Sequence, residues 1–226
     1  MKTDTELQHA VMEELAWEPS VDAAEIGVSA ESGIVTLSGI VKSLPQKWAA
    51  EKAAQRVSGV KAVTDEIAVK LPGDSELGDT EIARAAVNAL DWNASLPRGR
   101  VTLIVSHGWI TLEGTVPFHY ERVAADYAVR GLTGVKGVTN LISVKPQQIS
   151  PGNIKHRIEQ AFERAADLDA QTISVEAKDG RVILRGTVDS WAEREQAEWA
   201  AWPAPGVSHV ENEILVTSDQ EIVASL

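Results

Sequence analysis

The 226-residue chain has no cysteine. It also has only two tyrosines, two phenylalanines and two methionines. Without cysteine, neither a disulfide framework nor a thiolate metal site can form. No stretch approaches the roughly 18 consecutive apolar residues that a membrane-spanning helix needs. The 44% of residues that are hydrophobic are enough to form folded cores, so we expect a folded chain without a transmembrane segment.

Basic residues are also in short supply, with 21 Lys and Arg against 33 Asp and Glu and a formal net charge of −12. Residues 1–72, 73–146 and 147–226 each carry a net negative charge. A nucleic-acid binder needs a basic surface that displaces counterions from phosphates. Nucleic acid is therefore not an expected partner, and the same charge opposes adhesion to an anionic membrane.

No export signal is visible in the N-terminal residues, which read MKTDTELQHAVMEELAWEP. They contain acidic residues, no apolar core and no small-residue cleavage site, all unlike a signal peptide. From this we expect a cytoplasmic location.

The strongest positive signal is an internal repeat. Segment 31–70 aligns without a gap with 106–145 and with 178–217. Three glycine columns and several alternating apolar columns recur in the three segments. The glycines are Gly33, Gly39, Gly59, Gly108, Gly114, Gly134, Gly180, Gly186 and Gly206. We therefore expect repeat 1 at residues 1–72, repeat 2 at 78–146, repeat 3 at 150–217 and a C-terminal tail at 218–226.

Each repeat shows the same order of predicted elements. Apolar residues every three to four positions, such as Leu7, Val11 and Leu15, predict an opening helix. Its expected N-terminal caps are Thr3 with Glu6 in repeat 1, Asp79 or Thr80 in repeat 2 and Ser150 in repeat 3. Two alternating runs around a turn glycine predict a β-hairpin. An alanine-rich second helix, capped by Ser190 in repeat 3, and a final strand complete the repeat.

This order predicts an α+β fold of three tandem α-β-β-α-β units. A strand, crossover helix and strand are almost always right-handed, which places the second and third strands side by side and parallel. The first strand adds an antiparallel edge. Each repeat should thus be a three-stranded mixed sheet with two helices on one face.

The segment GLTGVKG at 131–137 is the nearest approach to a phosphate-binding loop. Such a loop follows a strand and opens a helix, so that backbone amides point at the phosphate. Here the glycines follow a predicted helix and precede a strand. A glycine just beyond a helix is the usual left-handed cap, so all nine recurring glycines are interpreted as turn and helix-cap residues.

The hairpin glycine, the V-x-L-x-G strand, the alanine-rich helix and the ending G-V-x-x-V-x-N/D-x-I-x-V resemble the BON domain, over nearly the whole chain and three times. This resemblance implies non-enzymatic bacterial modules associated with phospholipid binding, envelope integrity and osmotic stress. One cytoplasmic member of the family binds potassium. The chain differs from the best-known members of this family because no export signal is visible in it.

The tryptophans are the candidate interaction residues. Trp17 and Trp92 are repeat-equivalent at the end of the first helix, which favours packing. Trp199 and Trp202 stand where the other repeats have mostly polar side chains, so both are expected to face solvent. Together with Trp191 they predict a surface that docks on a neighbouring repeat or second chain, or that inserts at a lipid headgroup boundary. The acidity of repeat 3 favours protein contact.

No set of nucleophile, base and orienting group stands out, and the histidines lack the spacing of metal ligands. His107 and His119 could meet at one end of repeat 2, although surface positions explain them better. We therefore expect no catalytic residue, no metal site and no cofactor. The expected function is non-catalytic binding of a phospholipid surface or protein partner, with self-association through repeat 3 as one form. The alternative is a cytoplasmic module that responds to a monovalent cation such as potassium.

Overall fold

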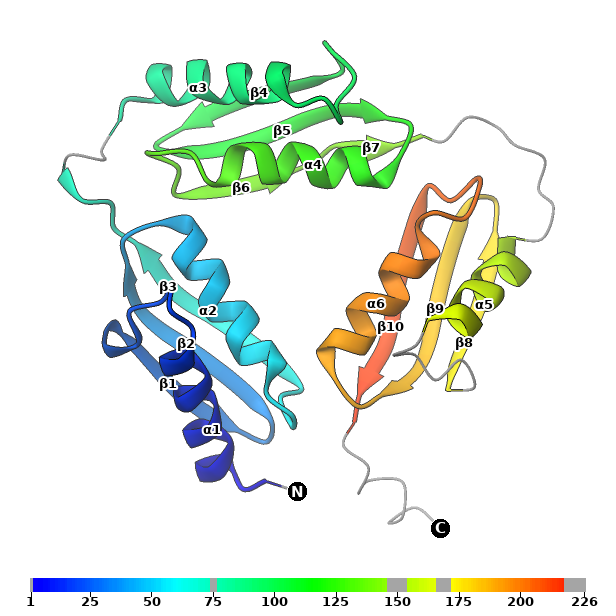
Figure 1. Cartoon of the computed structure of the whole chain (residues 1–226), viewed down its shortest axis with the longest axis horizontal. Coiled ribbons are helices and arrows are strands. Elements are labelled where there is room, and N and C mark those ends of the chain that lie inside the picture. Colours follow the sequence, from blue (N-terminus) through cyan, green and yellow to red (C-terminus); the bar gives the residue numbers. More distant parts are fainter. Residues whose placement is uncertain (1, 74–76, 146–153, 166–171, 218–226) are drawn as a thin grey trace. The chain divides into compact units, whose positions relative to one another are not determined.

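The computed structural model describes residues 2–73, 77–145, 154–165 and 172–217. It contains the three predicted α-β-β-α-β units (Figure 1). Repeat 1 comprises α1 (Asp4–Trp17), a short 3-10 turn (Ala23–Glu25), β1 (Ile26–Glu31), β2 (Ile34–Val41), α2 (Leu44–Arg56) and β3 (Ala62–Val69). Repeat 2 comprises α3 (Asp79–Trp92), β4 (Val101–Ser106), β5 (Trp109–Val116), α4 (His119–Arg130), β6 (Gly137–Asn140) and β7 (Ser143–Val144). Repeat 3 comprises α5 (Ile154–Arg164), β8 (Ile173–Lys178), β9 (Arg181–Val188), α6 (Trp191–Ala201) and β10 (His209–Val216). The expected tail at 218–226 lies outside the described residues.

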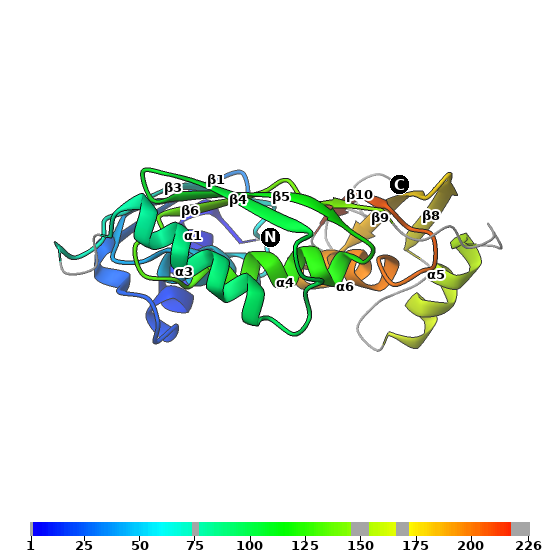
Figure 2. The ribbon, with the colours of Figure 1, turned by 90° about the horizontal axis from the view of Figure 1, so that it is seen from above.

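Each repeat forms its own mixed sheet, as the sequence predicted. The middle strands β2, β5 and β9 pair antiparallel with the strand before them. β5 and β9 also pair parallel with β6 and β10, and β3 takes the same place beside β2. Within repeat 2, α3 and α4 lie on one side of the sheet and leave the other side open (Figure 2). No helix in the described part of the chain is both long and apolar enough to cross a membrane.

The core of each repeat lies between this sheet and its two helices. Alternate residues of the middle strand are fully buried: Val35 and Leu37 in repeat 1, Ile110 and Leu112 in repeat 2, Val182 and Leu184 in repeat 3. The second helix meets them through small side chains, because Ala50, Ala125 and Ala197 have no exposed surface. Small side chains let that helix pack closely on the sheet.

Two of the three glycine columns meet backbone to backbone. A Cβ on the hairpin glycine Gly108 would lie 2.9 Å from the carbonyl oxygen of Gly134. In repeat 3 a Cβ on Gly180 would lie 2.8 Å from that of Gly206. The amide of Lys136 also donates to the carbonyl of Gly108 at 2.9 Å. We call this contact between the hairpin turn and the turn before the last strand the glycine joint. All nine recurring glycines have positive φ, at +83°, +134° and +98° in repeat 1, +81°, +142° and +91° in repeat 2, and +80°, +145° and +89° in repeat 3.

The glycine before the last strand lies farther from the helix than a C-terminal cap does. α4 ends at Arg130, and the amide of Val135 then donates to the carbonyl of Leu132 at 3.2 Å. Gly134 is thus the third residue of a separate four-residue turn, a position where positive φ is required in one common turn type. The same turn occurs in the other repeats, where Val60 donates to Val57 and Val207 to Ala204.

The final strand of repeat 2 is interrupted at Leu141–Ile142, although the sequence predicted one continuous strand. At this break the side-chain oxygen of Asn140 accepts from the Ile142 amide at 3.1 Å. Its amide group also donates to the Arg122 carbonyl of α4 at 2.8 Å. Asn212 makes the equivalent bonds in repeat 3. In repeats 2 and 3 this asparagine therefore ties the last strand to the second helix.

The predicted helix caps are present at Thr3 and Ser190, whose hydroxyls accept from the amides of Glu6 and Glu193 at 3.3 Å. Ser150 lies outside the described residues. In repeat 2 the cap position is Gly78, and Asp79 has another role. Its carboxylate accepts from the amides of His107 at 2.8 Å and Gly108 at 2.9 Å, which joins α3 to the hairpin turn.

Gly114→Ala should severely destabilise repeat 2. Gly114 has φ +142°, and a Cβ there would fall almost on the carbonyl oxygen of Arg100. Because both backbone strain and a clash result, we expect a loss of about 3 kcal/mol in the free energy of unfolding. Urea denaturation measures it. Gly131→Ala is the control, because Gly131 has negative φ and open space around it. Equal losses in the two variants would show that the close approach at Gly114 is unimportant.

Asp79→Asn should weaken repeat 2 in a pH-dependent way. Hydrogen bonds from Gly108 and His107 lower the pKa of Asp79 below its ordinary value of 3.8. The native state therefore favours the charged carboxylate, which stabilises the fold above that value and ceases to do so as the pH falls through the lowered pKa. The thermal midpoint of the variant should lie below that of the wild type at pH 7, and the difference should vanish in acid. Asp4→Asn, at the equivalent position of repeat 1, is the matched control variant.

Candidate functional site

The most exposed large side chains at equivalent places in the repeats are Trp17 and Trp92. They end α1 and α3 and are 83% and 88% exposed. The prediction that they have a packing role is therefore wrong. Helical periodicity gives the reason: Trp17 is two residues beyond the buried Leu15, hence about 200° around the helix axis. The same periodicity contained the signal that could have identified them.

The acidic residues beside Trp17 are paired. The guanidinium of Arg56 on α2 donates to Glu14 at 2.8 Å and to Glu18 at 3.3 Å. These bonds raise the pKa of Arg56, with Glu14 the larger cause. Hydrogen bonds from Ser20, assisted by Arg56, hold the pKa of Glu18 below its ordinary value. The end of α1 is thus fixed to the end of α2, and the carboxylates of Glu14 and Glu18, on either side of Trp17 in the sequence, are partly neutralised.

The end of α3 is held differently. The amide of Asn93 donates to the Leu90 carbonyl at 3.2 Å, and its side chain donates to the Ala124 carbonyl of α4 at 3.4 Å. The side-chain oxygen also accepts from the Ser95 amide at 2.9 Å. Trp92, directly before Asn93, is thus presented from a backbone bonded to its neighbours. Both tryptophans project from fixed helix ends.

The three candidate tryptophans of repeat 3 do not share one surface environment. Trp199 on α6 is 47% exposed, as expected, whereas Trp202 is only 9% exposed. The expectation that Trp202 faces solvent is therefore wrong. Trp191 begins α6, is half-buried, and carries the Arg194 guanidinium 5.0 Å from its ring centroid. Trp199 is thus the exposed member of this set.

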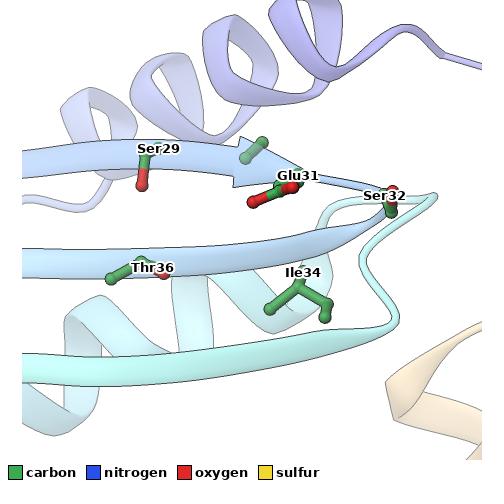
Figure 3. Close-up of a pocket in the computed structure, with 6 residues that line it drawn as sticks. Ser29, Glu31, Ser32, Ile34 and Thr36 are labelled. Carbon is green, nitrogen blue, oxygen red and sulfur yellow. The ribbon is translucent and has the colours of Figure 1, made fainter.

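A shallow hollow lies on the open face of repeat 1, beside the β1–β2 turn. Figure 3 shows Ser29 and Glu31 on β1 and Ile34 and Thr36 on β2 around it, with Ser32 at the turn. The strand register places Ser29 opposite Thr36 and Glu31 opposite Ile34. Both polar and apolar side chains line this hollow, and no sequence signal pointed to it.

His107 and His119 are not brought together. One lies before β5 and the other after it. This eight-residue strand is about 26 Å long, which separates the two histidines. Burial, with a smaller effect of Arg122, lowers the pKa of His119 to about 4. Across the described residues, no group of three or more His, Asp or Glu side chains is placed to hold a metal ion.

The shifted pKa values of the carboxylates mostly trace to bonds that hold the fold together. The pKa of Glu6 is lowered by Thr3 in the helix cap, and that of Glu211 by the Arg181 guanidinium. Burial raises the pKa of Asp126, which lies 3.7 Å from Arg130 on the same helix. What the described surface offers a ligand is therefore aromatic contact area rather than a cluster of reactive groups.

A repeated small α+β unit with open sheet faces and exposed tryptophans defines a class of tandem binding modules. The comparison with known families gives its name: the BON domain model matches residues 3–70, 78–146 and 151–218. The chain belongs to the BON domain family and contains three copies of the BON domain.

Two curated relatives agree. The osmotically-inducible protein Y of Escherichia coli is 28% identical over 130 residues, covering 56% of this chain and 65% of that protein. An uncharacterized protein from the gshII 5′ region of Anaplasma centrale is 47% identical over 49 residues, 22% of this chain and 32% of that protein. The chain thus spans less than two thirds of the length of either relative. The first relative is, by its name, osmotically inducible.

Among solved structures, CdsD, a structural protein of the type III secretion system of Chlamydia trachomatis, matches 96% of this chain and 95% of its own. Its C-terminal domain matches 96% of this chain and 100% of its own. The TM-scores are 0.27 and 0.26, with 14% and 13% identity. At these scores the likeness supports no conclusion about function.

The difference between Trp199 and Trp202 can be measured. Trp202→Ala should lower the free energy of unfolding by about 3 kcal/mol, because it removes a large buried aromatic side chain. Trp199→Ala should change it by less than about 0.5 kcal/mol, as surface substitutions do. Urea denaturation of the two single variants tests both values. A stable Trp202→Ala protein would contradict the burial of this side chain.

Proposed function

We propose that the chain is a non-catalytic, stress-related binding protein that attaches to phospholipid surfaces through Trp17 and Trp92. The observation that carries this proposal is their almost complete exposure at equivalent ends of two helices. Exposed large aromatic residues at fixed positions mark interaction sites rather than core packing. Tryptophan suits the headgroup boundary of a bilayer, because one part of the indole is apolar and its N–H remains in a polar layer.

Charge determines which phospholipid surface fits. The chain carries a net charge of −12 and is repelled by anionic headgroups. Beside Trp17, the Arg56 pairs reduce that repulsion locally. Two tryptophans on linked repeats also raise each other's effective concentration at a surface once one has inserted. We therefore favour a zwitterionic or weakly anionic surface bound through both tryptophans.

Flotation of the full chain with phosphatidylcholine vesicles tests the proposal. The wild type should float with the vesicles, and Trp17→Ala with Trp92→Ala should reduce the bound fraction about tenfold or more, because interfacial aromatic area is lost. Added phosphatidylglycerol should weaken binding at low salt, and raised salt should restore it. Trp199→Ala is the matched control, since it removes an exposed tryptophan from another repeat.

No binding to vesicles of any composition, or equal binding by the double variant, would contradict the proposal. Self-association lost specifically in Trp199→Ala would instead favour protein contact through repeat 3. A rise of the thermal midpoint in potassium chloride over sodium chloride at equal ionic strength would favour the ion-responsive alternative.

A further inference from the structure

The three repeats have the same backbone fold, but the side chains on the helix-free face of the sheet differ from one repeat to the next. The first open-face position of the middle strand is Ile34 in repeat 1, Trp109 in repeat 2 and Arg181 in repeat 3. Since all three form the same hairpin, the fold does not require a tryptophan there. The choice of side chain at this position therefore reflects what each face contacts.

In repeat 3 the open face is occupied by ion pairs between neighbouring strands. Arg181 lies 2.5 Å from Glu211, and Arg185 lies 2.8 Å from Glu176 and 2.6 Å from Glu213. These arginine and glutamate side chains neutralise one another's charge across all three strands of the sheet. This face therefore serves as the internal comparison for that of repeat 2.

In repeat 2 three residues combine to hold one flat aromatic ring. A Cβ on Gly137, across the parallel pairing from Trp109, would overlap the six-membered ring of that tryptophan. The ring therefore lies over the Gly137 backbone, and its Nε1 donates to the Thr139 hydroxyl at 2.8 Å. Repeats 1 and 3 have a side chain, Ala62 or His209, at the glycine position. We call Trp109, Gly137 and Thr139 the repeat 2 platform.

The platform leaves one face of the indole for a ligand. Trp109 is 49% exposed although its N–H is already bonded within the repeat. A ring held on one side by backbone and on its edge by a hydroxyl loses little freedom when a second flat group stacks on it. The platform is thus ready for stacking before any ligand arrives.

The residues around the platform are apolar or carry hydroxyl groups. Strand register places Ser106 opposite Trp109, Ile104 opposite Thr111, and Thr102 opposite Glu113 on this face. Ile104 and Leu141 are exposed beside them. Glu113 is the one charged residue among these strand positions of the described repeat 2 face. The surface therefore combines one aromatic ring, aliphatic groups, hydroxyls and a single carboxylate.

We propose that the repeat 2 platform binds a neutral, β-linked glycan. A β-linked pyranose with equatorial hydroxyls has a flat C–H face that can stack on the indole, and a rim of hydroxyls that can bond to Thr, Ser and carboxylate oxygens. Charge complementarity favours this ligand, because the strand positions of this face carry one carboxylate and no basic residue, which on a chain of net charge −12 disfavours phosphates and other polyanions. The site involves neither Trp17 nor Trp92 and goes beyond lipid attachment.

Calorimetric titration of the full chain with cellohexaose and chitohexaose tests the proposal, with the α-linked maltohexaose as the comparison glycan. One or both β-linked hexamers should bind, and maltohexaose should bind at least tenfold more weakly because its curved chain stacks poorly. Trp109→Ala should weaken binding about tenfold or more, and Trp109→Phe should retain most of it. Thr139→Val, which releases the indole N–H but leaves the ring, should have an intermediate effect.

Trp199→Ala and Ile34→Ala are the controls, an exposed tryptophan elsewhere and the equivalent residue of repeat 1. Both should bind glycan as the wild type does. The chitohexaose used is the fully N-acetylated, uncharged form, so that its binding does not reflect attraction to the net charge of −12. The proposal is overturned if neither β-linked hexamer binds, or if Trp199→Ala loses as much affinity as Trp109→Ala. It is equally overturned if a proline-rich peptide or a second copy of the chain binds through Trp109 and glycans do not. Thermal midpoints of Trp109→Phe and Thr139→Val identify any loss caused by unfolding.

Discussion

The contact on which each repeat depends is the glycine joint, where the hairpin turn and the turn before the last strand touch through their backbones. In repeats 2 and 3 a Cβ on the hairpin glycine would lie within 2.9 Å and 2.8 Å of the opposing carbonyl oxygen. A side chain on the hairpin glycine would collide with that carbonyl and separate the last strand from the hairpin, and the parallel pairing could not form in this register. The second helix, which lies between these two strands in sequence, can then pack only on one face.

Once the backbone is fixed in this way, the open faces and helix ends are free to differ. Repeat 3 covers its sheet with paired charges, repeat 2 presents an indole whose N–H is hydrogen-bonded, and repeat 1 has a hollow beside its hairpin turn. The tryptophans at the ends of α1 and α3 are shared by repeats 1 and 2, whereas repeat 3 has Arg164 there. The binding surfaces that we propose therefore consist of side chains that the fold does not need.

The fold could be predicted from the sequence because it depends on residue spacing. The glycine columns, the alternating strand patterns and the helical apolar patterns together agree with one order of helices and strands. Side-chain environments were harder to predict. Repeat equivalence suggested packing for Trp17, although its angle from Leu15 already placed it outside the core. For Trp202 the error was the opposite one. Polar residues at the equivalent positions of the other repeats suggested that it is exposed, whereas it is buried. The repeat 2 platform needed the structure, since only the parallel register brings Gly137 beneath Trp109.

Hydrogen–deuterium exchange of the intact chain, with and without phosphatidylcholine vesicles, tests most directly whether a constant frame carries separate binding surfaces. Bound vesicles should slow exchange at the C-terminal ends of α1 and α3, around Trp17 and Trp92. The amides of the glycine joint, including those of Lys61, Lys136 and Ser208, should exchange slowly in both states, because each is hydrogen-bonded to a hairpin glycine. Fast exchange at these amides, or vesicle protection spread over the strands and absent from the two helix ends, would contradict the account.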